Sequence, residues 1–380
     1  MFGKKASAGG VVAVVDIESG SAGVAIVKTG GPGQVLAYAR EHLSLEERAK
    51  ESLRSAIIQA LVAAGEKALT AHANNGGPKQ LSACYCVIGA PWTSSFAGSA
   101  RSKLEHPAVI TDKQISALAK QALADQKDID PANLLEANVS RVLLNGYPTS
   151  EPEGKRAQVI DVFTLTSGCD ADLKSAAAES LAKLFPDADI VWRSSARATF
   201  SAVKQLDPVE TCLVIDMGTE ATDLIGLRKG MLEQRVLIEQ GVRKVLATFA
   251  KDKPVEETIA LIDMLEKDQC ETDVCEALRQ SIAKAEPELV HLFGEALAKL
   301  SATRKLPDEL VLIAPPALAP WLSRFFARID FTQFTATTKP FSVRIFSGAE
   351  LPGIPHNDPS IFADPSICMA CGLVNMELSR

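Results

Sequence analysis

The sequence predicts an α/β protein of two lobes, each built around a strand–turn–strand hairpin. The chain has 380 residues, enough for two lobes of ordinary domain size with separate cores. One pattern occurs twice: an apolar run ends in an aspartate, a turn rich in glycine, serine and threonine follows, and a second apolar run returns. The two copies cover residues 11–27 and 212–227, and Asp16 and Asp216 end the first run of each.

The composition of these turns indicates a binding site for phosphate. Such a turn directs backbone N–H groups and hydroxyls at one point, which suits phosphate oxygens. An aspartate at the strand end can hold a metal-bound water beside those oxygens. Two hairpins facing each other would hold a nucleotide phosphate tail from both sides. The alternative for Asp16 and Asp216 is structural, because aspartate often caps a turn after a strand.

At these residues the chain resembles the actin-like ATPase superfamily, with residues 16–21 in place of its first phosphate loop and 216–223 in place of its second. Within that superfamily it is most similar to the bacterial branch of the cell-division protein FtsA and the pilus-assembly protein PilM. The resemblance covers residues 11–373, and the second hairpin with its continuation to residue 241 carries most of the specificity. It implies a ribonuclease H-like two-lobed fold with a small inserted α+β subdomain of the SHS2 type in the first lobe.

The resemblance also implies ATP and Mg²⁺ as ligands. The residues expected to face them are Asp16, Ser19, Ser21, Asp216, Gly218, Thr219, Thr222, Asp223 and Gly241. Asp16 and Asp216 would hold the Mg²⁺ through water. For Thr222 and Asp223 the alternative is that they only stabilise the hairpin. No catalytic residue is assigned, since spacing places none of the candidates for orienting a water.

Several positions depart from the family pattern. Glu18 stands where the first loop of the family has glycine, and a carboxylate there would repel a triphosphate. The family's adenosine-binding Gly-Gly turn matches residues 315–316, which are both proline and so lack an N–H and room for close approach. Thr219 and Glu220 stand where the second loop of the family has further glycines. Another Gly-Gly pair of the family matches residues 240–241, which are Gln and Gly in this chain. Weak binding and no binding therefore both stay open, and efficient catalysis is the least expected.

Periodicity and turn signals predict the remaining elements in order. After the first hairpin we expect a helix at 44–71, a strand at 83–88, a helix at 112–124, sheet strands at 141–148 and 159–165, and helices at 171–185 and 195–204. After the second hairpin we expect helical structure at 256–300, a strand at 310–313, a helix at 321–326 and a closing helix at 367–376. The domains follow: a disordered tail 1–10, a first lobe 11–83 and 166–209, the inserted subdomain 84–165, and a second lobe 210–380.

Composition excludes some classes of protein. The net charge is -7 and no basic cluster offsets it, which argues against a nucleic-acid partner. The apolar run 11–15 is too short for a signal peptide, and no run approaches the roughly 18 apolar residues of a membrane span. We therefore expect a cytoplasmic protein without direct membrane insertion. Cys368 and Cys371 have a metal-site spacing but are expected to be buried helix thiols, and Trp92 is expected to anchor its loop.

Three functions remain open. The first is a PilM-like assembly scaffold of type IV pili, held at the inner membrane through a PilN-like partner peptide that binds near the inserted subdomain. The second is an FtsA-like division protein that links FtsZ to the membrane. The third is a sugar- or acetate-kinase type enzyme, for which no substrate pocket is visible. FtsA proteins usually end in an amphipathic helix that binds the membrane. In this sequence residues 375–380 come directly after the predicted closing helix, with no such amphipathic helix, which favours the first hypothesis. Self-association is left open.

Overall fold

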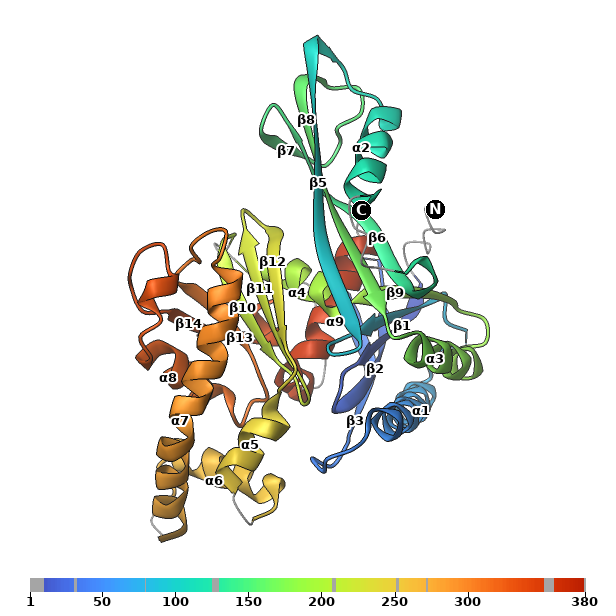
Figure 1. The fold of residues 1–380 in the computed structure, drawn as a ribbon. Coiled ribbons are helices and arrows are strands. Elements are labelled where there is room, and N and C mark those ends of the chain that lie inside the picture. The colour runs from blue at the N-terminus through green and yellow to red at the C-terminus, as the bar shows by residue number, and fades with distance from the viewer. Residues whose placement is uncertain are drawn as a thin grey trace.

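The computed structural model describes residues 10–30, 33–78, 80–124, 130–206, 210–250, 253–270, 273–351 and 359–378. Apart from Gly10, the predicted tail lies outside these ranges. The chain forms two lobes, each with a central sheet, and a narrow subdomain that rises from the first lobe (Figure 1). Among the described residues, no helix combines the length and the apolar character that a bilayer crossing requires.

The two lobes contain sheets of the same design. The first sheet has the order β3-β2-β1-β4-β9, formed by β1 (Val11–Ile17), β2 (Ser21–Lys28), β3 (Gln34–His42), β4 (Ala83–Ile88) and β9 (Asp189–Ser194). The second has the order β12-β11-β10-β13-β14, formed by β10 (Cys212–Met217), β11 (Thr222–Arg228), β12 (Met231–Ile238), β13 (Glu309–Ile313) and β14 (Ser342–Ile345). In each sheet the first strand pairs antiparallel with the second strand and parallel with the fourth. The predicted pair of hairpins is therefore the start of each sheet.

Helices cover both faces of both sheets. On the outer side of the first sheet lie α1 (Lys50–Asn74) and α3 (Ala171–Leu184). Against the outer side of the second pack α5 (Val242–Ala250), α7 (Asp273–Leu300) and α8 (Ala319–Arg328), with α6 (Val255–Glu266) beyond them. Between the sheets lie α4 (Ser195–Val203) and α9 (Pro365–Leu378), which contact each other (Figure 1). Short 3₁₀ turns occupy Pro131–Asn133, Thr332–Phe334, Gly348–Glu350 and Pro359–Ala363.

Burial on both faces explains why the central strands are apolar throughout. Side chains alternate between the faces of a strand. In β1, Val12 and Val14 face the layer of α4 and α9, while Ala13 and Val15 face α1 and α3. The first strand of the second lobe alternates in the same way, and one shared core between the sheets includes residues of both.

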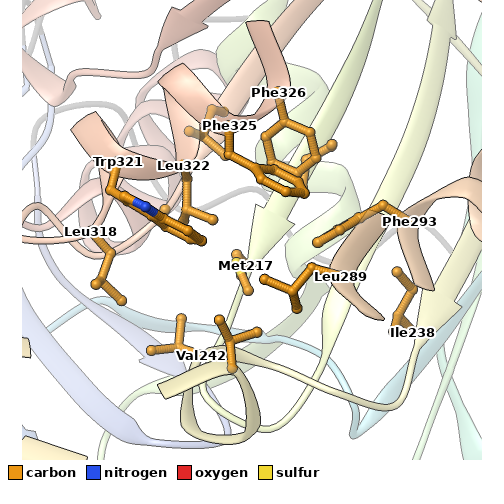
Figure 2. Close-up of a cluster of buried hydrophobic side chains, with 14 of the residues drawn as sticks. Met217, Ile238, Val242, Leu289, Phe293, Leu318, Trp321, Leu322, Phe325 and Phe326 are labelled. Atoms are coloured by element: carbon orange, nitrogen blue, oxygen red, sulfur yellow. The ribbon is translucent and has the colours of Figure 1, made fainter. Parts of the chain in front are cut away.

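The outer core of the second lobe is rich in aromatic side chains. Trp321, Phe325 and Phe326 of α8 point toward Phe293 of α7 (Figure 2). The Phe293 and Phe326 rings meet edge to face with centroids 4.9 Å apart, a favoured aromatic geometry. Met217, at the end of β10, belongs to the same cluster. This packing fixes the strand that carries Asp216.

The inserted subdomain is a sheet with one helix. Its sheet has the order β5-β8-β6-β7, from β5 (Thr93–Val109), β6 (Leu134–Leu144), β7 (Tyr147–Thr149) and β8 (Arg156–Cys169), and α2 (Asp112–Ala124) covers one face. Thr111 caps α2: its hydroxyl accepts from the Gln114 N–H, and the Gln114 side chain accepts from the Thr111 N–H at 2.9 Å. Buried Glu136 of β6 ties the subdomain to the first lobe by accepting from Ser194 and Arg197.

The structure corrects two predicted boundaries. The strand 83–88 does not belong to the inserted subdomain but is β4, between β1 and β9, because its apolar side chains are buried on both faces. The subdomain therefore starts near Thr93 rather than at residue 84, and β8 continues to Cys169 rather than ending at 165. The closing helix α9 is not confined to the second lobe, since it also packs on β1, β2 and α4.

The start of α1 differs from the prediction, whereas Trp92 and the two thiols of α9 are buried as expected. The predicted start of the first helix at residue 44 is wrong, because α1 begins at Lys50 and its N-cap Ala49 makes no side-chain hydrogen bond. Trp92 is 3% exposed in the core under α1 and α3, as expected of an anchor. The thiols of Cys368 and Cys371 are free and buried in α9. Among the described residues, no group of His, Cys, Asp and Glu side chains has a metal-binding arrangement.

Candidate functional site

The turns of the two hairpins touch each other at the interface of the lobes. The Glu220 N–H donates a hydrogen bond to the Ser19 hydroxyl oxygen at 3.0 Å. Gly20 lies against Thr219 so closely that a Cβ on Gly20 would stand 1.9 Å from the Thr219 Oγ1. The two predicted phosphate loops are therefore in direct contact.

Asp16 is buried at the end of β1 and is paired with an arginine of the same lobe. The Arg40 Nη2 lies 2.5 Å from the Asp16 Oδ2, and the Arg40 Nη1 donates to the Ser21 hydroxyl at 2.6 Å. The remaining Arg40 nitrogen, Nε, donates to Asp364, which also accepts from the Tyr38 hydroxyl. Arg40 thus joins the first hairpin to the segment before α9, and its side chain is only 7% exposed.

A glycine makes room for this arginine. In the register of the sheet, Gly23 on β2 lies between Asp16 on β1 and Arg40 on β3. A Cβ on Gly23 would meet the Arg40 guanidinium at 2.7 Å. Because glycine has no side chain, the guanidinium can cross β2 and reach Asp16.

The charges of this cluster shift its titration. Burial and the negative charges of Glu18 and Asp364 raise the pKa of Asp16 to about 8, although Arg40 acts in the opposite direction. Burial alone would lower the pKa of Arg40, but Asp364, Asp16 and Glu18 together raise it well above its usual range. One guanidinium thus serves three carboxylates, and the raised pKa of Asp16 indicates that one of them retains a proton near neutral pH.

In the second hairpin the predicted groups also have partners within the chain. The Thr222 hydroxyl donates to the Gln240 carbonyl at 2.8 Å, and Asp223 accepts from the Arg235 Nε at 2.7 Å with both oxygens. Burial raises the pKa of Asp223 despite Arg235. Both oxygens of Asp223 are therefore already bound by a neighbouring side chain.

The backbone N–H groups at the N-terminus of α5 also have hydrogen-bond partners within the chain. The Val242 N–H donates to the Gly218 carbonyl at 2.9 Å, and the Arg243 N–H donates to the Thr219 carbonyl at 3.1 Å. Gly241 lies so close to both carbonyls that a Cβ would stand 2.3 Å from the Gly218 oxygen. Helix N-termini commonly bind anions, but these two N–H groups bind the turn itself.

Asp216 is the predicted residue that stays open. Its carboxylate is half-buried and makes no hydrogen bond or ion pair with any residue in the described part of the chain. Burial and the charges of Glu18, Asp223 and Asp16 raise its pKa well above the usual range. It lines a cavity of about 500 Å³ between the lobes, together with Thr219, Arg40 and the two prolines, Pro315 and Pro316.

This arrangement does not fit the phosphate tail of a Mg²⁺-nucleotide between the turns. Arg40 already pairs with the Asp16 carboxylate that would hold a metal-bound water, and Gly20 packs directly on Thr219 where the two turns meet. Glu18 adds a carboxylate within 3.8 Å of Arg40. The nine predicted residues do lie on the two facing hairpins and at the start of α5, and four of them line the cavity between the lobes: Ser21, Asp216, Gly218 and Thr219.

Sequence reasoning missed Arg40, Tyr38, Asp364 and Arg235. Each meets its partner through strand register or through a distant segment, and Arg40 and Asp364 are 324 positions apart. The one local signal was Gly23, a glycine inside an otherwise apolar strand, which commonly marks the close approach of another group.

A second feature of functional interest lies between the subdomain and the second lobe. A groove of about 770 Å³ runs between β5 and β12, and Trp92 and Asp170 are among the residues that line it. β5 is an edge strand of the subdomain sheet, and β12 is an edge strand of the second-lobe sheet. The Arg235 Nη2 crosses from β12 to the Thr93 carbonyl at 3.2 Å.

The paired sheets, their strand order and the facing hairpins define the actin-like ATPase fold. One solved structure similar to this chain is the "PilM-PilN type IV pilus biogenesis complex", with a TM-score of 0.58 and 14% identity, covering 97% of this chain and 98% of that chain. At that identity the likeness establishes the fold alone.

Two further structures are similar at lower TM-scores. The ethanolamine utilization protein EutJ from Carboxydothermus hydrogenoformans has a TM-score of 0.45 and 12% identity, covering 96% of this chain and 89% of that chain. A Bacteroides thetaiotaomicron protein with an actin-like ATPase fold has a TM-score of 0.38 and 10% identity, covering 88% and 90%. Both TM-scores are too low to bear on function. No protein-family model and no curated protein matches the sequence.

Proposed function

We propose that the chain is a PilM-like assembly scaffold at the cytoplasmic face of the inner membrane, and that it works without nucleotide. The observation that carries the proposal is the closed contact of the turns, in which Arg40 binds Asp16 and Gly20 packs on Thr219. In a nucleotide-dependent member of the fold, bound ligand would hold such turns together. Here side chains of the protein take that role, so the lobes keep one relative position.

A scaffold of this kind acts by binding a partner. The similar solved structure is a complex of PilM with PilN. We propose that this chain likewise binds an extended peptide of a membrane protein, and that the peptide lies beside the inserted subdomain. The groove between β5 and β12 supports this placement, because it is a concave surface of about 770 Å³ between the subdomain and the second lobe.

Calorimetric titration with Mg-ATP tests the nucleotide part of the proposal. We expect no saturable heat up to millimolar ATP, either for the natural chain or for the Asp16→Ala, Asp216→Ala double variant. Micromolar binding that the double variant abolishes would contradict the proposal and establish a working nucleotide site. The double variant separates site binding from non-specific heat.

Deletion of the gene tests the cellular part. Loss of surface pili in cells that divide normally is the expected result, and electron microscopy with cell-length measurement reads out both. Long undivided cells with normal pili would instead support the division function. Complementation with the single variant Asp216→Ala, which leaves the contact between Arg40 and Asp16 in place, should restore pili, because the proposed scaffold does not depend on a bound nucleotide.

A further inference from the structure

We propose that the free edge of β5 is a strand-addition site, where an extended segment of a partner protein pairs with residues 93–97 and fills the groove toward β12. The proposal rests on the proposed scaffold function and names the way in which the partner binds. It commits to a polypeptide in the extended conformation as the occupant.

The hydrogen-bond pattern shows which backbone groups of β5 are free. The Asp170 N–H donates to the Trp92 carbonyl at 2.8 Å, so these two residues form a hydrogen-bonded pair at the start of the β5–β8 ladder. In an antiparallel ladder such pairs recur at every second residue. Ser94 and Phe96 therefore pair with β8, and the backbone groups of Ser95 point away from it.

The outward edge faces the groove. Thr93 is two residues from Ser95, so its backbone groups also point away from β8. The Thr93 carbonyl accepts a hydrogen bond from the Arg235 Nη2 of β12 at 3.2 Å. Within the described residues, β5 pairs only with β8, and β12 pairs only with β11. Two sheet edges from different lobes therefore form the walls of one groove.

An extended backbone is the chemistry that this edge recognises. Outward N–H and C=O groups repeat every two residues, about 7 Å apart, and an added strand matches that repeat with its own groups. The five groove residues from Thr93 to Ala97 span about 17 Å, enough to pair with a short segment. Unpaired strand edges are otherwise exposed to unwanted pairing, and the second lobe restricts access to this one.

The site also reaches the second hairpin. Arg235 donates to Asp223 through its Nε and to Thr93 through its Nη2. A segment that pairs with β5 would replace the Nη2 contact and leave the contact with Asp223 in place. Arg235 is therefore a positioning residue at one end of the groove.

The test uses variants that remove one outward N–H. Ala97 is exposed and lines the groove, and its backbone N–H points away from β8 as that of Ser95 does. Ala97→Pro therefore removes an outward N–H without breaking the hydrogen bonds between β5 and β8. Ala97→Ser keeps the N–H and is the matched control. Hydrogen exchange of the free chain should first show Ser95 and Ala97 exchanging faster than Ser94 and Phe96, and equal protection of all four amides would overturn the proposal.

Binding is then measured with peptides selected from a displayed random dodecapeptide library on the full-length natural chain. We expect the selected peptides to protect the Ser95 and Ala97 amides, to bind Ala97→Pro at least tenfold more weakly, and to bind Ala97→Ser within about twofold of the natural chain. Methylation of alternate backbone nitrogens of the peptide should weaken its binding to the natural chain as strongly as Ala97→Pro does.

The outcomes separate the two proposals. Peptides that bind Ala97→Pro as well as the natural chain, and that protect another surface, would overturn strand addition while leaving the scaffold function intact. Failure of any peptide to bind the natural chain, together with normal pili in the deletion strain, would overturn both. Equal melting temperatures of the two Ala97 variants confirm that each is folded.

Discussion

The Ser19 hydroxyl oxygen accepts a hydrogen bond from the Glu220 N–H, and this bond joins two turns that are 201 positions apart in the chain. Each turn follows the first strand of one sheet, so the bond links the equivalent points of the two lobes. The lobes are therefore held together at the place where other proteins of this fold are expected to hold a ligand.

Removal of Arg40 should destabilise the fold strongly. Arg40→Met leaves Asp16 and Asp364 buried without a cation, and breaking such a pair typically costs about 3–5 kcal/mol. Urea unfolding measures the loss. The Arg40→Met, Asp16→Asn double variant should recover part of it, and Lys183→Met, in an exposed pair with Glu179, should cost under about 0.5 kcal/mol. Equal costs for the Arg40 and Lys183 variants would contradict the assignment.

The contact between the turns should respond to the size of residue 20. Gly20→Ala places a methyl group against Thr219 and is expected to cost about 1–3 kcal/mol through overpacking. Thr219→Gly in the same chain should relieve the clash, so the double variant should be more stable than the sum of the two single changes predicts. Strict additivity of the free energies of unfolding would show that the turns do not touch in solution.

Asp16 should make stability depend on pH. Its pKa is raised from 3.8 to about 8, so between these values the folded chain holds a proton that the unfolded chain has lost. The contribution is complete below about pH 4 and is lost as pH rises through about 8, with a slope of up to about 1.4 kcal/mol per pH unit. Asp16→Asn should flatten the slope of the unfolding free energy between about pH 5 and pH 8. An unchanged slope would assign the proton to another group.

Glu136 should hold the inserted subdomain to the first lobe. Its carboxylate accepts from the Ser194 N–H at 2.9 Å, from the Ser194 hydroxyl at 2.6 Å and from Arg197 at 3.2 Å. Glu136→Ala leaves these buried donors without an acceptor, and each lost charged hydrogen bond typically costs about 1.5–3 kcal/mol. Glu136→Gln, which keeps one acceptor oxygen, should cost less. Limited proteolysis should cut the subdomain faster in the alanine variant than in the glutamine variant.

Much of the fold could be predicted from the sequence because its repeated pattern is local. The apolar runs before Asp16 and Asp216, and the turns after them, lie within a few residues of one another and predict hairpins. The limit of this reasoning shows at 83–88: an apolar run of six residues is equally suited to either sheet, and only pairing with β1 and β9 decides.

The state of the candidate site could not be predicted in the same way. Glu18 and the two prolines at 315–316 showed that the loops depart from the family pattern, but not what the loops do instead. The answer lies in Arg40, whose reach to Asp16 depends on strand register, and in Asp364, which comes from the far end of the chain. Contacts of that kind leave no periodic trace in a sequence.

The core shared by the two sheets has a consequence for evolution. The helices α4 and α9 bury the inner faces of both sheets, so neither half keeps a complete core without the other. The shared core therefore holds the halves together whether or not a ligand occupies the cleft. Residues of the turns can consequently change in evolution without separating the two halves of the molecule.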